Sequence, residues 1–146
     1  MITEGDVKMP RRATLGSAGY DFFSPGTYEL RPGEWTMIDT GVSLEGNEYV
    51  YTKFDTCMLH DFEKWFMMLV PKSGLSTKYG FQVRSIGIID MDYRDTIKAM
   101  VSVDAPYVLQ KDEKFMQGIL LPFGVFVGEI KPTEARNGGH GSTGRF

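Results

Sequence analysis

The stretch GIIDMDYRDTIKAMVSV, residues 87–103, decides the fold of this chain. Alternate positions of its second half, residues 97–103, carry apolar side chains, and more polar side chains fill the positions between them. A period of two residues is typical of a half-buried β-strand. We therefore expect two strands, at residues 88–89 and 97–103, joined as a hairpin by a polar bend over residues 90–95.

The polar bend has two interpretations. Asp90 and Asp92 bracket a single residue, and Tyr93 and Arg94 follow them. In one interpretation the aspartates only bond their own backbone in a tight turn; in the other, one of them is a catalytic carboxylate. A calcium loop of the DxDxDG type is excluded, because Arg94 stands where an oxygen ligand is needed and the sixth position is not glycine.

The composition is that of one ordinary globular domain. The chain has 146 residues, of which 42% are hydrophobic and 24% charged, with a net charge of -3. No basic patch indicates a nucleic-acid partner, and no apolar run is long enough to span a membrane. Because Cys57 is the single cysteine and the N-terminus lacks the apolar run of a signal peptide, we expect a cytoplasmic protein. His60 and His140 show no zinc spacing, so no metal site built by the protein is expected.

Turn residues interrupt the apolar segments throughout. Seventeen glycines and seven prolines separate short apolar runs, a pattern that favours an all-β sandwich or barrel. We expect one short helix at residues 73–79, which Gly80 is placed to end. Strands are expected at residues 7–9, 20–23, 27–30, 35–44, 49–54 and 65–70, with buried strands again in the apolar stretch 119–130.

Five short motifs resemble, in order, those of the trimeric dUTPase family. They are AGYD at 18–21, PKSGLS at 71–76, GIIDMDYR at 87–94, Gln117 after a charged turn, and GGHGSTG at 138–144. The resemblance implies a distorted jelly-roll β-barrel and a homotrimer with shared active sites. It also implies hydrolysis of dUTP to dUMP and pyrophosphate, with Mg²⁺ held by the triphosphate and water, which would limit uracil in DNA.

The same resemblance assigns roles in the stretch 87–94. Asp90 would orient and activate the attacking water, and an ordinary aspartate is ionised at neutral pH, ready to accept a proton. The backbone at Gly87 and Ile89 would read the uracil edge. Tyr93 would stack under the deoxyribose and exclude a 2′-hydroxyl.

Phosphate contacts are implied at two further places. Lys72, Ser73 and Gly74 would bind the phosphates, and the Gln117 amide would hold one oxygen; Asp21 would only support its neighbours. The tail 133–146 would be a flexible arm that closes over the nucleotide, although its composition alone favours a disordered terminus. Its implied contacts are Arg136 with the γ-phosphate, His140 with uracil, and Gly141, Ser142 and Thr143 with the phosphates.

The chain also departs from the family pattern. Lysine replaces arginine at Lys72 and Lys114, Arg84 and Asp95 replace a common asparagine and glycine, His140 replaces phenylalanine, and Ala135 shifts the motif's arginine by one position. Residues 53–63 form an insertion, in which a short helix beginning near Thr56 fits the apolar spacing. The insertion is either a surface elaboration or a site for a regulatory partner.

Two other functions remain open. A dCTP deaminase shares the expected fold, but this chain offers Thr96, Ile97 and Lys98 where that family places a proton-shuttling glutamate. A nucleotide-binding regulator without activity is the other alternative, motivated by the insertion and by the departures at Arg84 and Ala135.

Overall fold

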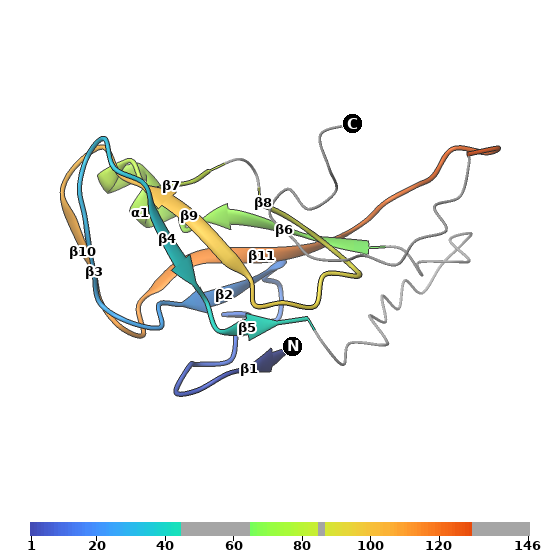
Figure 1. Ribbon diagram of the computed structural model, residues 1–146, viewed down its shortest axis with the longest axis horizontal. Coiled ribbons are helices and arrows are strands. Elements are labelled where there is room, and N and C mark those ends of the chain that lie inside the picture. The colour runs from blue at the N-terminus through green and yellow to red at the C-terminus, as the bar shows by residue number, and fades with distance from the viewer. Residues whose placement is uncertain (45–64, 85–86, 130–146) are drawn as a thin grey trace.

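The computed structural model describes residues 1–44, 65–84 and 87–129. Over these ranges the chain is mostly β-strand, with a single short helix, as expected (Figure 1). The elements are β1 (Ile2–Thr3), β2 (Gly19–Phe23), β3 (Tyr28–Leu30), β4 (Thr36–Asp39), β5 (Val42–Ser43), β6 (Trp65–Pro71), α1 (Ser73–Tyr79), β7 (Gln82–Val83), β8 (Gly87–Asp90), β9 (Lys98–Ser102), β10 (Tyr107–Leu109) and β11 (Lys114–Pro122).

The largest sheet has four antiparallel strands in the order β2-β11-β6-β8. Strands β6 and β11 run side by side through the centre of the molecule (Figure 1). On β6, buried residues alternate with half-buried ones, so Trp65, Met67 and Leu69 face the core. The opposite face of this sheet, which carries Phe66, Met68 and Val70, is called the outer face below.

The core lies between this sheet and a second sheet of order β4-β9-β7. The alternation expected for residues 97–103 is confirmed: Ile97, Ala99, Val101 and Val103 are all buried, and the residues between them are half-buried. Strands β3 and β10 pair at one end of the molecule, and β1 pairs with β5. The short helix α1 ends at Gly80, whose φ of 62° is left-handed.

The expected hairpin at residues 88–103 is wrong, although both of its strands exist. Strand β8 pairs with β6, whereas β9 pairs with β4 and β7. The bend after Asp90 therefore carries the chain from one sheet to another. Periodicity fixes which residues face the core, but it does not identify the strand's partner.

Three strand expectations also fail within the described residues. Residues 7–9 belong to no strand, and the first strand is β1. The run 35–44 is divided into β4 and β5, because Gly41 adopts a left-handed φ of 64°. Beyond Pro122 the chain leaves the sheet, and residues 123–129 are exposed instead of forming buried strands (Figure 1).

Several expectations lie outside the described residues. These are the strand at 49–54, the helix near Thr56, the insertion at 53–63 and the arm at 133–146. In the ranges that are described, no helix has the length and apolar character needed to cross a membrane.

Candidate active site

A buried carboxylate organises one end of the candidate site. Asp21 on β2 is only 2% exposed, and its two oxygens lie 2.9 Å from Lys72 Nζ and 2.8 Å from Lys114 Nζ. The Lys72 contact is a hydrogen bond as well as an ion pair, and the Lys114 contact is an ion pair. Burial by itself raises the pKa of Asp21, but the two lysines outweigh it and hold the pKa below its ordinary value.

The expected phosphate-binding residues gather beside this carboxylate. Lys72 immediately precedes α1, and the next two residues, Ser73 and Gly74, are exposed. Gln117 on β11 is paired with Asp21 on β2. Its side chain lies over Gly19, where an added Cβ would come within 2.7 Å of Gln117 Oε1. Glycine at position 19 therefore leaves space for the amide, so β2, β11 and α1 together position these side chains.

Asp90 lies at the other end of the same sheet. It is the last residue of β8, is exposed, and pairs with Phe66 on β6. Its carbonyl accepts a hydrogen bond of 3.0 Å from the Tyr93 backbone N–H, which closes the turn after the strand. Arg94 Nη1 donates to the Met91 carbonyl at 2.7 Å. The turn is therefore held by bonds within itself, and it ends the strand at the carboxylate.

Tyr93 is less accessible than its expected contact with a sugar suggests. The side chain is only 6% exposed, and it lies outside the main cluster of core side chains. Its hydroxyl donates to the Thr96 carbonyl at 3.1 Å. The ring is thus fixed under the turn that follows Asp90, and only a small part of it faces solvent.

Asp90 and the expected phosphate-binding residue Gln117 lie on the same face of the sheet but near opposite ends of β6. Paired residues of antiparallel strands point to the same face of a sheet, so Asp90, Phe66, Val70 and Gln117 all lie on the outer face. Gln117 pairs with Val70 and Asp90 pairs with Phe66, four residues away along β6, a separation of about 13 Å along the strand. One chain therefore does not bring the Asp90 carboxylate and the expected phosphate-binding residues together.

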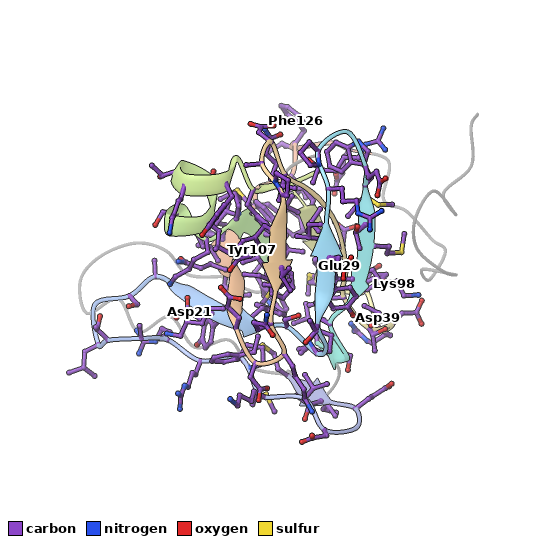
Figure 2. All side chains as sticks on the ribbon, turned by 90° about the vertical axis from the view of Figure 1, so that its left-hand side faces the viewer. Asp21, Glu29, Asp39, Lys98, Tyr107 and Phe126 are labelled. Atoms are coloured by element: carbon purple, nitrogen blue, oxygen red, sulfur yellow. The ribbon has the colours of Figure 1, made fainter. Side chains whose placement is uncertain are left out.

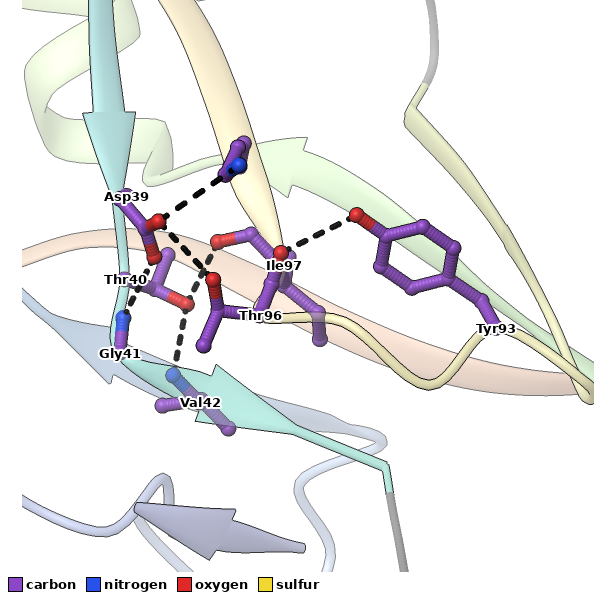
Figure 3. Close-up of polar contacts among 8 residues, drawn as sticks. Asp39, Thr40, Gly41, Val42, Tyr93, Thr96 and Ile97 are labelled. Atoms are coloured by element: carbon purple, nitrogen blue, oxygen red, sulfur yellow. Dashed lines mark hydrogen bonds and ion pairs between the residues drawn. The ribbon is translucent and has the colours of Figure 1, made fainter. Parts of the chain in front are cut away.

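A network around Asp39 had no role assigned from the sequence. Asp39 Oδ2 accepts a hydrogen bond of 2.9 Å from Thr96 Oγ1, and Asp39 Oδ1 accepts one of 3.0 Å from the Gly41 N–H (Figure 3). Lys98 Nζ lies 3.9 Å from Asp39 Oδ2, and Figure 2 shows these two residues on a side of the molecule away from Asp21. The signal in the sequence was the run Asp39-Thr40-Gly41, whose polar side chains interrupt an apolar strand.

The expected contacts from the tail, Arg136, His140, Gly141, Ser142 and Thr143, lie outside the described residues. In the part of the chain that is described, no group of three or more His, Cys, Asp or Glu side chains could hold a metal ion.

The chain is similar to known proteins along most of its length. The model of the dUTPase family matches residues 44–144, which is more than half of the chain. The deoxyuridine 5'-triphosphate nucleotidohydrolase of Lactococcus lactis is 30% identical over 94% of this chain and 89% of its own length. The chain belongs to the dUTPase family.

Other dUTPases support this assignment along nearly the whole chain. The deoxyuridine 5'-triphosphate nucleotidohydrolase of Nautilia profundicola is 31% identical over 96% of this chain and 93% of its own length. The solved structure of the dUTPase from phage phi11 of S. aureus has a TM-score of 0.67 and 22% identity, and covers 92% of this chain and 94% of that one. The all-β dUTPase fold expected from the sequence is therefore confirmed.

Proposed function

We propose that this protein hydrolyses dUTP to dUMP and pyrophosphate, limiting uracil incorporation into DNA. The observation that carries the proposal is the position of Asp90. This carboxylate stands exposed at the end of β8, within the GIIDMDYR motif of a chain that matches dUTPases over nearly its full length. It lies on the outer face of the sheet together with Gln117, so the proposed base and this proposed phosphate-binding group are on the same side of the sheet.

Asp90 acts as the general base in this proposal. The carboxylate accepts a proton from a water molecule as the water oxygen bonds to the α-phosphorus. The bond from the α-phosphorus to the bridging oxygen breaks, and pyrophosphate leaves with both electrons of that bond. Such a transfer depends mainly on positioning and on neutralising charge, which is the work we assign to Lys72, Ser73, Gly74 and Gln117.

Mg²⁺ enters as part of the substrate. The surroundings of Ser73 and Gln117 are cationic, since Lys72 and Lys114 lie there and the nearby carboxylate of Asp21 is already ion-paired. These positively charged groups are better suited to bind phosphates than to bind a metal ion directly. Mg²⁺ is commonly bound through phosphate oxygens and water, where it shields charge and fixes the conformation of the triphosphate.

Selectivity for uracil is assigned to the backbone of β8. This strand is at the edge of its sheet among the described strands, so one side of its backbone is not used by that sheet. Near Gly87 and Ile89 the chain can match uracil's acceptor, donor, acceptor pattern. Cytosine presents a donor where uracil presents an acceptor, and a buried mismatch of this kind is costly.

We propose a homotrimer in which neighbouring subunits complete each site. In one chain Asp90 and the phosphate-binding residues are separated along β6, so a second subunit is needed to supply one of them. The outer face between them is apolar and suits coverage by another protein surface. Its apolar residues are Phe66, Met68, Val70, Ile88, Ile119 and Leu121. Phe126 and Val127, which follow β11, are almost fully exposed and offer further apolar surface. Figure 2 shows Phe126 at the edge of the molecule.

The remaining parts of the proposal concern residues outside the described ranges. Residues 1–146 form one domain, and the arm 133–146 closes over the nucleotide through Arg136, His140, Gly141, Ser142 and Thr143. The insertion at 53–63 is a site for a regulatory protein partner; the phage phi11 dUTPase is likewise described as having a species-specific insert. The cytoplasm is the proposed compartment.

The proposal is tested by identifying the products in water enriched in oxygen-18. Incubation with dUTP and Mg²⁺ is expected to yield dUMP and pyrophosphate, with the heavy oxygen in dUMP, because water attacks the α-phosphorus. Heavy oxygen in pyrophosphate would contradict that mechanism. Ammonia released from dCTP would instead identify the deaminase alternative, and tight binding of dUTP without turnover would identify a regulator.

A further inference from the structure

The carboxylate of Asp39 connects two segments that are far apart in the sequence. Asp39 ends β4, and its Oδ2 accepts the hydroxyl hydrogen of Thr96 at 2.9 Å. Thr96 lies two residues before the start of β9 at Lys98, at the end of the turn that begins at Asp90. The bond therefore attaches the turn's far end to the second sheet.

Thr96 transmits this attachment to Tyr93. Its hydroxyl is held by Asp39, while its carbonyl accepts the Tyr93 hydroxyl at 3.1 Å (Figure 3). The Tyr93 N–H in turn donates to the Asp90 carbonyl at 3.0 Å. A continuous chain of hydrogen bonds thus runs from Asp39 through Thr96 and Tyr93 to the backbone of Asp90.

The Asp39 end of this chain is firmly held. Thr40 is fully buried, and both its N–H and its hydroxyl donate to the Ile97 carbonyl, at 2.9 and 2.7 Å. The Ile97 N–H donates to the Val42 carbonyl at 2.7 Å, and the Val42 N–H donates to Thr40 Oγ1 at 3.2 Å. The turn after Asp90 is consequently fixed against a part of the fold that has little freedom to move.

We propose that Asp39 is a positioning residue for the Asp90 turn and, through Thr96, for the ring of Tyr93. It thereby helps to select a deoxyribose over a ribose. The selectivity part rests on the proposed function, in which Tyr93 contacts the sugar. The ring of Tyr93 can reject a 2′-hydroxyl only if its position does not shift, since a displacement of about 1 Å would make room for the extra oxygen.

The test replaces the two partners separately and together. Thr96→Val removes the hydroxyl at constant shape, Asp39→Ala removes the acceptor, and Thr96→Ser keeps the hydroxyl while removing only a methyl group. Each single change is expected to reduce the ratio of kcat/KM for dUTP to kcat/KM for UTP by about tenfold. The double variant is expected to lose no more than Asp39→Ala alone, because that change already breaks the Thr96 bond, together with the bond from the Gly41 N–H. Thr96→Ser is expected to keep the wild-type ratio.

A second measurement does not depend on activity. Hydrogen exchange of the Tyr93 amide, followed by NMR, is expected to accelerate in Thr96→Val and in Asp39→Ala, because the turn that protects this amide loses its anchor. Lys98→Gln is the matched control. It removes the partly exposed ammonium 3.9 Å from Asp39 Oδ2 but leaves the Thr96 bond intact, so both readouts should stay at the wild-type value.

The outcomes separate this inference from the proposed function. Unchanged exchange of the Tyr93 amide in both single variants would overturn the positioning role, whatever the activity. Faster exchange with an unchanged dUTP to UTP ratio would overturn the role in selectivity. A wild-type protein that hydrolyses neither nucleotide would refute the proposed function and the selectivity with it, while amide exchange would still decide the positioning role.

Discussion

Asp21 illustrates how a charged residue is accommodated on a sheet face. A buried carboxylate is costly unless charged partners lie close to it, and here Lys72 and Lys114 provide them. Neither position carries an arginine, whose planar guanidinium could bind both oxygens of a carboxylate. Instead, two separate ammonium groups neutralise the same carboxylate. The ion pair also places both ammonium groups beside Gln117, where we propose that phosphates bind.

Asp21→Asn is expected to lower the free energy of unfolding by about 2 kcal/mol at pH 7, because both lysines lose their charged partner. The lowered pKa of Asp21 gives this effect a pH dependence. A carboxyl whose pKa is depressed on folding contributes its stability above its unfolded pKa, and loses it as the pH falls through the folded pKa. The difference between wild type and variant, measured by urea unfolding, should therefore be constant above about pH 5 and shrink below it.

Asp6→Asn provides the control for this experiment. Asp6 also contacts a lysine, Lys111, at 2.6 Å, but its side chain is 97% exposed. Solvent screens such a pair, so the variant should unfold like the wild type at pH 7. An Asp21→Asn variant as stable as Asp6→Asn would show that the buried ion pair makes no net contribution.

The strands were predictable wherever alternation was long and uninterrupted. Residues 97–103 appear with the expected buried face, because a period of two residues leaves a single way to bury the apolar set. The failures occur where the backbone or a distant partner decides. Gly41 divides one expected strand, and the apolar residues after Pro122 have no strand to pair with among the described residues.

The helix terminus at Gly80 offers a prediction for a single element. Gly80 has a left-handed φ of 62°, and an added Cβ would lie 2.2 to 2.6 Å from side-chain atoms of Asp104. Gly80→Ala is expected to lower the free energy of unfolding by about 2 kcal/mol, since it adds backbone strain to this steric clash. The measurement is urea unfolding monitored by far-UV circular dichroism.

Gly16→Ala is its matched control. No atom lies within 4 Å of a Cβ added at Gly16, and this glycine does not have a left-handed φ. The control should therefore remain as stable as the wild type or become slightly more so. Equal stability of the two variants would contradict the steric explanation.

The proposed assembly rests on how the proposed site is divided between the ends of β6. Asp90 and the proposed phosphate-binding residues were chosen from sequence motifs, but their separation could not be predicted, because it depends on the register of three strands. The roles of Asp39 and Thr96 were also hidden, since 57 residues separate them in the sequence and only the fold brings them into contact.

Mixing two inactive variants tests the shared site. Asp90→Asn lacks the proposed base, and a Ser73→Ala, Gln117→Ala double variant lacks phosphate contacts. If neighbouring subunits supply these two groups, unfolding and refolding the variants together in equal amounts should rebuild about a quarter of the sites. The measurement is the recovered rate of pyrophosphate release. No recovery from a mixture that forms trimers would contradict sites shared in this way.

The most direct test of the central claim compares wild type with Asp90→Asn. Both proteins are incubated with Mg²⁺ and, separately, dUTP, dCTP, dTTP and UTP, and all products are separated and quantified. We expect the wild type to convert dUTP alone to dUMP and pyrophosphate, and we expect Asp90→Asn to lose at least about a hundredfold in rate while it still binds dUTP. An Asp90→Asn variant that hydrolyses dUTP at the wild-type rate would contradict the assignment of Asp90 as the base.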